Sequence, residues 1–215
     1  MPLPPSIYHL SSSHLRLDGR RWNELRRLTA QISTQASADG SSYLEMGNTK
    51  VLCTVTGPSE GKGGGRRGDE DSMSVDVRVN VAGFAGMDRK RVGRGDRRIT
   101  ELQNTISSAF SSTLFTHLYP HSTISLQIHI LSLDGSLLAA SLNAATLALI
   151  DAGVPMRDYL VACTAGLTPP SGRGDGDDMD PLLDLNGSEE TEVPFLTVGT
   201  GGAGGGDVGG GGGWV

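Results

Sequence analysis

The chain has 215 residues, of which 37% are hydrophobic, and its formal net charge is −6 at pH 7. This length suits one domain with a sizeable core. The negative net charge argues against a protein that binds along nucleic acid through its overall electrostatic field. A local basic patch is still compatible with it. Because the sequence lacks a charged leader and any run of about 18 apolar residues, we expect neither secretion nor a membrane span.

The two ends of the chain have compositions that do not favour a packed core. Residues 1–14 are rich in proline and serine, and we expect a flexible N-terminal arm there. Residues 199–215 are mostly glycine, which buries too little apolar surface to offset chain entropy, so we expect a disordered tail. The predicted domain therefore covers residues 15–198.

The N-terminal half of the domain predicts a sheet. Residues 16–26 form a polar run whose single tryptophan, Trp22, we expect to pin an extended segment to the surface. Short turns containing glycine separate the first three of the strand candidates, and these three are expected to form an antiparallel meander. The candidates are residues 28–36, 41–46, 49–57 and 74–83.

Residues 86–98 are the one concentrated basic segment of the chain, with Arg89, Lys90, Arg91, Arg94, Arg97 and Arg98. The segment is either a loop of solvated charges or a contact to nucleic-acid phosphates that weakens with salt. An amphipathic helix is predicted over residues 97–118. Arg97 and Arg98 then fall in its first turn, where cations oppose the helix dipole, and a partner anion would account for that placement.

Residues 122–155 are the most apolar part of the chain. Isoleucine and leucine alternate with polar residues up to Ile130, which predicts a strand with one buried face. A turn at Asp134 and Gly135 leads into a helix that begins near Ser136, is apolar on nearly every side and ends at Gly153. We expect this helix to pack on a sheet, and we expect any active site at the strand-to-helix corner, where a helix N-terminus attracts anions.

The remaining segments complete an α+β pattern. Residues 158–167 predict another buried strand, and residues 168–180 a polar loop whose four aspartates fit a solvated loop better than a cation site. Two short strand candidates then lie around Glu189, Glu190 and Glu192. Together the segments predict an α+β domain with mixed strand connections.

Several of these stretches, in this order, resemble the ribonuclease PH family, and within it the subunits of the eukaryotic exosome ring. The resemblance implies a ribonuclease PH-like fold with a ribosomal protein S5 domain 2-like β-α-β-α core. The family continues beyond residue 198 with a strand and a long helix that this sequence lacks, so we expect uncovered apolar surface. The stretches are residues 16–26, 38–58, 97–98, 118–124, 133–159 and 181–190.

The resemblance also implies site residues. Active members of the family degrade RNA from its 3′ end with phosphate as the attacking group. Arg97 and Arg98 match the pair that grips RNA, and Arg91 and Arg94 extend that basic segment. Ser136 keeps the hydroxyl of the phosphate site, but Leu137 replaces its arginine and offers no donor. The acidic positions are also altered, which leaves Glu190 and Glu192 as vestigial catalytic candidates. We expect no metal and no cofactor.

The sequence therefore predicts a non-catalytic core ring subunit of the RNA exosome that binds and guides single-stranded RNA during 3′-to-5′ processing and degradation. The implied partners are homologous ribonuclease PH-like subunits in a hexameric ring, cap proteins and a separate catalytic nuclease, in the nucleus, nucleolus and cytoplasm. Two alternatives stay open. One is an active phosphate-dependent 3′-to-5′ exoribonuclease, and the other is an unrelated scaffold whose basic loop binds nothing.

Overall fold

The computed structural model describes residues 15–16, 18–60, 73–86, 89, 93, 95–168 and 181–201. Strands and helices follow one another in the predicted α+β manner, and no described helix is long and apolar enough to cross a bilayer. The elements are β1 (Leu28–Ile32), β2 (Gly40–Met46), β3 (Thr49–Glu60), β4 (Ser74–Val81), α1 (Arg97–Thr113), the 3₁₀ turn η1 (Thr116–Leu118), β5 (Ser122–Ser132), α2 (Leu137–Asp151), β6 (Val161–Leu167), β7 (Pro181–Leu183), α3 (Gly187–Glu192) and β8 (Phe195–Thr200).

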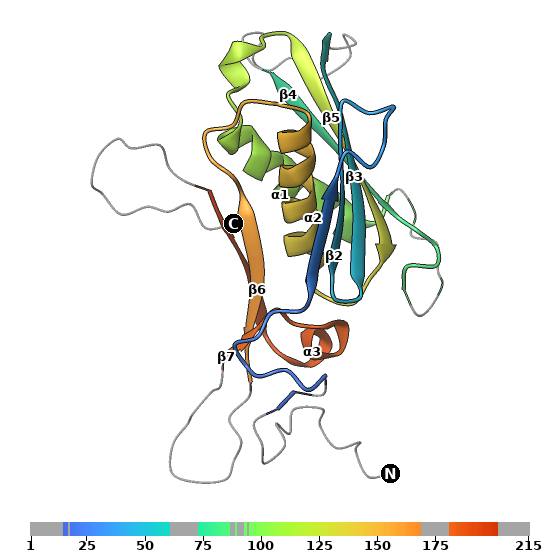
Figure 1. The fold of residues 1–215 in the computed structure, drawn as a ribbon, viewed down its shortest axis with the longest axis vertical. Coiled ribbons are helices and arrows are strands. Elements are labelled where there is room, and N and C mark those ends of the chain that lie inside the picture. The colour runs from blue at the N-terminus through green and yellow to red at the C-terminus, as the bar shows by residue number, and fades with distance from the viewer. Residues whose placement is uncertain are drawn as a thin grey trace, which may run out of the picture.

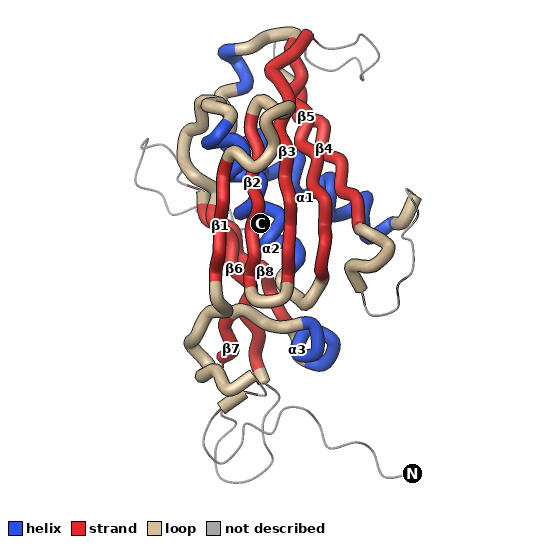
Figure 2. The backbone as a smooth tube through the Cα atoms, turned by 45° about the vertical axis from the view of Figure 1, so that its right-hand side comes forward, coloured by secondary structure: helices blue, strands red, loops and turns tan. Residues whose placement is uncertain are grey.

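The larger sheet has five strands in the order β1-β2-β3-β5-β4 (Figure 2). The first three strands form the predicted antiparallel meander, and β5 continues it by pairing antiparallel with β3. β4 pairs with β5 in parallel, and α1 makes the connection between them. The C-terminal ends of β4 and β5 therefore meet at the same end of the sheet, and the segments that follow these two strands start close together.

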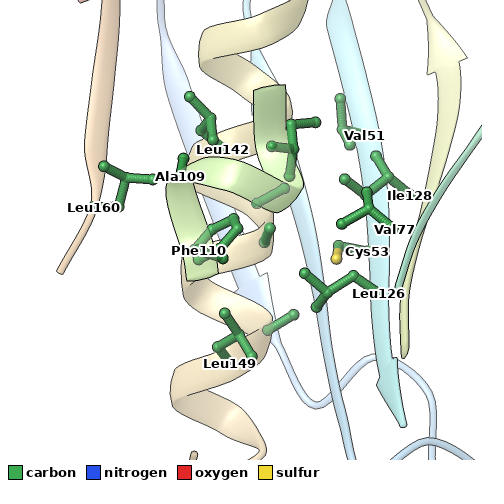
Figure 3. Packing of buried hydrophobic residues seen from close by; sticks show 14 of the residues in the cluster. Val51, Cys53, Val77, Ala109, Phe110, Leu126, Ile128, Leu142, Leu149 and Leu160 are labelled. Carbon is green, nitrogen blue, oxygen red and sulfur yellow. The ribbon is translucent and has the colours of Figure 1, made fainter. Parts of the chain in front are cut away.

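The core lies between this sheet and a smaller one, with α2 in the middle (Figure 1). The alternation in β5 is realised fully, because Ile124, Leu126, Ile128 and Ile130 are all buried. Figure 3 shows Leu126 and Ile128 among the core side chains. Each such side chain contributes about 1.5–3 kcal/mol relative to an exposed one. Helix α2 lies so close to β2 that a Cβ added to Gly40 of β2 would lie 2.3 Å from the Ala148 carbonyl oxygen. Helix α2 is thus buried on nearly every side, as predicted.

The smaller sheet has the order β7-β6-β8, and both pairings are antiparallel. Ala162 and Thr164 of β6 are buried, so alternation places Val161 and Leu167 on the opposite face. Val161 is 58% exposed, and Leu196 of β8, on the same face, is 66% exposed. Within the described part of the chain no element covers this apolar face.

Several predicted boundaries were wrong because tertiary contacts, which the sequence alone does not display, set where the elements end. β1 stops at Ile32, since Ser33 adopts a positive φ of 53° and donates two hydrogen bonds to Asp151. Helix α1 ends at Thr113, where the Leu114 N–H bonds to Phe110, and Leu118 is exposed. Strand β8 reaches Thr200, two residues into the predicted tail. The rest of that tail from residue 202, and the predicted arm 1–14, lie outside the described residues.

Candidate functional site

The strand-to-helix corner joins β5 to α2 through Asp134, Gly135 and Ser136. Gly135 has a φ of +75°, and a Cβ there would lie 2.5 Å from the carbonyl carbon of Asn186, so only glycine fits. The Thr49 hydroxyl donates to the Gly135 carbonyl at 2.8 Å and accepts from the Asp134 N–H at 3.1 Å. The corner is therefore held rigidly by β3 on one side and by the segment before α3 on the other.

Ser136 is the N-cap of α2, but its hydroxyl does not cap the helix. The residue is 1% exposed, and the hydroxyl donates to the Leu185 carbonyl at 2.9 Å and toward Asp184 Oδ1 at 3.2 Å. The group that the sequence assigned to an attacking phosphate is thus turned inward. It ties α2 to the segment that precedes α3.

Glu190 is the acidic candidate that the fold brings to this corner. Its Oε1 accepts a hydrogen bond from the backbone N–H of Ser136, at the positive end of α2. Burial raises the pKa of Glu190, and the nearby charges of Asp134 and Asp184 raise it further, whereas the Ser136 bond and the Arg26 charge partly oppose them. Glu190 therefore occupies the position at which an external anion would meet the helix.

Glu192, the second acidic candidate, is not part of this cluster. It lies exposed at the end of α3 and makes no hydrogen bond or ion pair among the described residues. The described residues also contain no cluster of three or more His, Cys, Asp or Glu side chains placed to hold a metal ion. The structure thus brings Ser136 and Glu190 together and leaves Glu192 apart.

Helix α3 itself was missed, since the sequence predicted only strands around these glutamates. A capping box starts the helix: Asn186 Oδ1 accepts from the Glu189 N–H at 3.0 Å, and Glu189 Oε2 accepts from the Asn186 N–H at 3.0 Å. An Asn followed three residues later by Glu is a helix-start signal that could have revealed α3. α3 directs Glu190 toward the start of α2, and it lies below that end of α2 in Figure 1.

Asp184 and Arg26 form a buried ion pair beside Ser136 that sequence reasoning also missed. Asp184 is 1% exposed and accepts from the Arg26 backbone N–H and from Arg26 Nη2, both at 2.8 Å. Burial alone would raise the pKa of Asp184, but the hydrogen bonds and charge of Arg26, with the Ser136 bond, outweigh it and lower the pKa. Arg26 Nη1 also donates to the Asp134 carbonyl, so this arginine links the corner to Asp184.

Arg16 makes a second buried ion pair with Glu189, and it also donates to the Leu183 carbonyl at 2.6 Å. The polar run 16–26 is therefore anchored by its arginines. Trp22 is 48% exposed and its carbonyl accepts from the Leu183 N–H at 2.9 Å, so the pinning of this run by the tryptophan side chain stays a prediction. Both arginines pair with residues more than 150 positions away in sequence.

Arg97 and Arg98 lie in the first turn of α1, as predicted, and both are exposed. The Asp96 side chain caps this helix by accepting from the Arg98 N–H at 3.0 Å. Arg97 Nε donates to Glu101 at 3.0 Å, but 91% of the Arg97 side chain is exposed, so the pair adds little stability. Within the described chain the Arg98 guanidinium has no partner. Arg91 and Arg94 lie outside the described residues.

The strand-to-helix corner and the segment that leads to α1 lie at the same end of the larger sheet. The corner follows the C-terminal end of β5, and the segment leading to α1 follows the C-terminal end of the parallel neighbour β4. The Leu133 N–H bonds to the Ala85 carbonyl at 3.0 Å, which joins the two segments directly. This end of the sheet therefore carries exposed cations that suit a polyanion. At the corner, by contrast, the N-terminus of α2 is already occupied by a carboxylate.

Comparison with known proteins agrees with this architecture. Residues 24–155 match the model of the RNase PH, 3′ exoribonuclease family, domain 1. The crystal structure of rice Rrp46 superposes with a TM-score of 0.73 at 26% identity, covering 86% of this chain and 79% of that one. These matches define a domain of the ribonuclease PH class and confirm the predicted fold.

Comparison with sequence relatives supports the same family assignment. The chain is 42% identical over 191 residues to exosome complex component ski6 of Schizosaccharomyces pombe, covering 88% of this chain and 74% of the relative. It is 42% identical over 181 residues to human exosome complex component RRP41, covering 84% and 70%. The chain therefore belongs to the 3′ exoribonuclease family, as its sequence motifs indicated.

Proposed function

We propose that this chain is a non-catalytic core ring subunit of the RNA exosome, which binds and guides single-stranded RNA during 3′-to-5′ processing and degradation. Family membership and the names of its relatives, which are exosome complex components, support the place in the ring. The observation that carries the non-catalytic assignment is the Glu190 carboxylate on the Ser136 N–H.

A phosphate that attacks RNA at this corner needs donors for its oxygens. The Ser136 N–H is taken by Glu190, and the Ser136 hydroxyl is buried and donates to Leu185. Leu137, where active relatives are expected to carry arginine, supplies no donor. An incoming phosphate would also face the Glu190 charge, and two like charges about 4 Å apart repel by roughly 1–4 kcal/mol near a protein surface. The loss of donors and the electrostatic repulsion both weaken binding of phosphate at the corner.

RNA binding is assigned to the start of α1. Arg97 and Arg98 project from the fold with no strong internal partner, so their charges are available to RNA phosphates. Arg91 and Arg94 belong to the same basic segment and are included in the proposal on sequence grounds. The proposal also includes the partners and the location of the chain. The partners are the homologous subunits of a hexameric ring, cap proteins and a separate catalytic nuclease, and the location is nuclear, nucleolar and cytoplasmic.

The test is an assay for phosphorolysis. The full chain, assembled with a homologous ring subunit, is incubated with single-stranded RNA and inorganic phosphate, and nucleoside diphosphates are measured against a reaction without the assembly. We expect no product above that background. Glu190→Gln and Glu192→Gln are run in parallel as a matched pair, because only Glu190 contacts the corner.

Phosphate-dependent release of nucleoside diphosphates that Glu190→Gln abolishes and Glu192→Gln preserves would identify the chain as an active exoribonuclease instead. In that case Glu190 would have to leave the Ser136 N–H during turnover.

A further inference from the structure

β1 forms one free edge of the larger sheet. Figure 2 shows it as the outermost strand, and in the described chain its one partner strand is β2. An edge strand without charge or proline is open to pairing with another chain. β1 reads LTAQI and has neither, whereas β4, at the opposite edge of the same sheet, carries Asp76 and Arg78. The β1 edge therefore lacks the features that keep edge strands from pairing.

The backbone of β1 presents regularly spaced hydrogen-bonding groups on its free side. The Gly47 N–H bonds to the Arg27 carbonyl at 2.9 Å, and the Ser33 N–H bonds to the Ser41 carbonyl at 2.9 Å. Both pairs continue the β1–β2 register, so the odd-numbered residues of β1 form the hydrogen-bonded pairs with β2. The N–H and C=O groups of the even-numbered residues point the other way, and in the described chain they have no partner. These residues are Leu28, Ala30 and Ile32.

The same three residues carry apolar side chains on one face of the sheet. The register places Ala30 opposite Leu44 of β2, whose side chain is buried in the core. Leu28 is nevertheless 61% exposed and Ile32 is 53% exposed. Ile150, at the end of α2 that contacts Ser33 of the β1 end through Asp151, is 40% exposed. Exposed apolar surface therefore accompanies the free backbone groups along the edge.

The β1 edge is complementary to itself. When a second β1 is laid antiparallel along the edge with Ala30 opposite Ala30, Leu28 falls opposite Ile32 of the second copy at both ends. The free N–H and C=O groups of these residues then meet in hydrogen-bonded pairs, and their apolar side chains meet on one face. The polar Thr29 and Gln31 meet on the other face. A two-fold axis at Ala30 thus satisfies both the backbone and the side chains.

We propose that the β1 edge binds the β1 edge of a second copy of this chain, which joins the two larger sheets into one continuous sheet about a two-fold axis at Ala30. Such a symmetric dimer uses the same surface of both copies and closes on itself. The paired strands are short, so the dimer is weak and dissociates on dilution. The inference goes beyond the proposed function, because neither RNA nor another kind of subunit takes part in it.

The first test measures the mass of the full chain against concentration by sedimentation equilibrium. We expect the mass to rise from 22.5 kDa toward twice that value. Ala30→Lys places two like charges opposite each other at the axis and should weaken the dimer about tenfold. Asn80→Lys is the matched control, because it adds the same charge to the exposed surface of β4 at the other edge. It should dimerise as wild type does.

The second test locates the axis with a disulfide, and it does not depend on the folding of Ala30→Lys. In the proposed dimer the two Cα atoms at position 30 lie about 5.5 Å apart, within the reach of a disulfide. Ala30→Cys should therefore give a covalent dimer on oxidation with diamide, in a Cys163→Ser background that removes the half-buried native thiol. Gln31→Cys is the matched control, because its two Cα atoms would lie more than about 7 Å apart.

A wild-type chain that stays monomeric up to about 1 mM would overturn the proposal. A dimer that Ala30→Lys leaves unchanged would also overturn it, as would Ala30→Cys that forms covalent dimer no faster than Gln31→Cys, because the interface would then lie elsewhere. If the chain alone is monomeric and Ala30→Lys prevents its assembly with a homologous ring subunit, the edge binds that subunit, and the second copy is the wrong occupant.

Discussion

Helices α1 and α2 begin at the same end of the larger sheet, but their first turns are built in opposite ways. The start of α2 is buried, and the charged groups around it have partners. Glu190 accepts a hydrogen bond from the Ser136 N–H, and Asp184 forms an ion pair with Arg26. The start of α1 is exposed and carries two arginines against the helix dipole, with Glu101 as the only described acidic partner of Arg97.

This difference separates charges that hold the fold together from charges that are free to bind. A buried ion must be paired, because an uncompensated charge in the interior is costly. An exposed ion contributes little to stability, and its charge remains able to interact with a ligand. Substitutions at the α2 corner should therefore change stability, whereas substitutions at the start of α1 should change RNA binding.

The largest expected effect comes from Arg26→Ala, which leaves the Asp184 carboxylate buried without its partner. We expect a loss of about 3–5 kcal/mol in the free energy of unfolding, measured by urea denaturation. Arg97→Ala is the matched control at α1, where the exposed pair with Glu101 should cost less than about 0.5 kcal/mol. Similar losses in the two variants would contradict the division between the helix starts.

The next effect is on RNA binding by Arg97→Ala/Arg98→Ala. Removing two phosphate contacts to a single strand should reduce the slope of log affinity against log salt by about 1.4. Fluorescence anisotropy with a labelled oligoribonucleotide over a salt series measures that slope. Arg27→Ala is the control, because Arg27 is exposed next to β1 at the opposite edge of the sheet. A slope that the double variant leaves unchanged would favour the scaffold hypothesis.

The smallest effect concerns the pH dependence of stability at Glu190. Because the folded-state pKa of Glu190 is raised, the fold favours the protonated acid, and its contribution to stability is lost as pH rises through that pKa. Glu190→Gln keeps an acceptor for the Ser136 N–H without the charge. The difference in Tm between Glu190→Gln and wild type should therefore be more positive at pH 7 than at pH 4.

The lowered pKa of Asp184 acts with the opposite sign, since its contribution is present at neutral pH and lost as pH falls. It is common to both proteins and cancels in their difference. Glu192→Gln is the matched control, because Glu192 is exposed and lies apart from the corner. A difference for Glu190→Gln that does not vary with pH would show that Glu190 is not held in the buried position at the corner.

The sequence by itself determined those features that depend on near neighbours along the chain. Alternation in β5 predicted its buried face, the apolar run after Ser136 predicted α2, and the glycine at position 135 marked the corner. The motifs predicted the family, and the order of residues placed Arg97 and Arg98 in the first turn of α1. Period and spacing are local properties, so a single sequence displays them.

Only the tertiary structure decided which of the charged residues meet. Arg16 pairs with Glu189 across 173 positions, and Arg26 pairs with Asp184 across 158. Of the candidates Glu190 and Glu192, the fold brings Glu190 alone to Ser136, because α3 starts at Asn186 and turns Glu192 to the solvent. No local pattern encodes such pairs, since they form only when the packing of α2 between two sheets brings distant segments of the chain together.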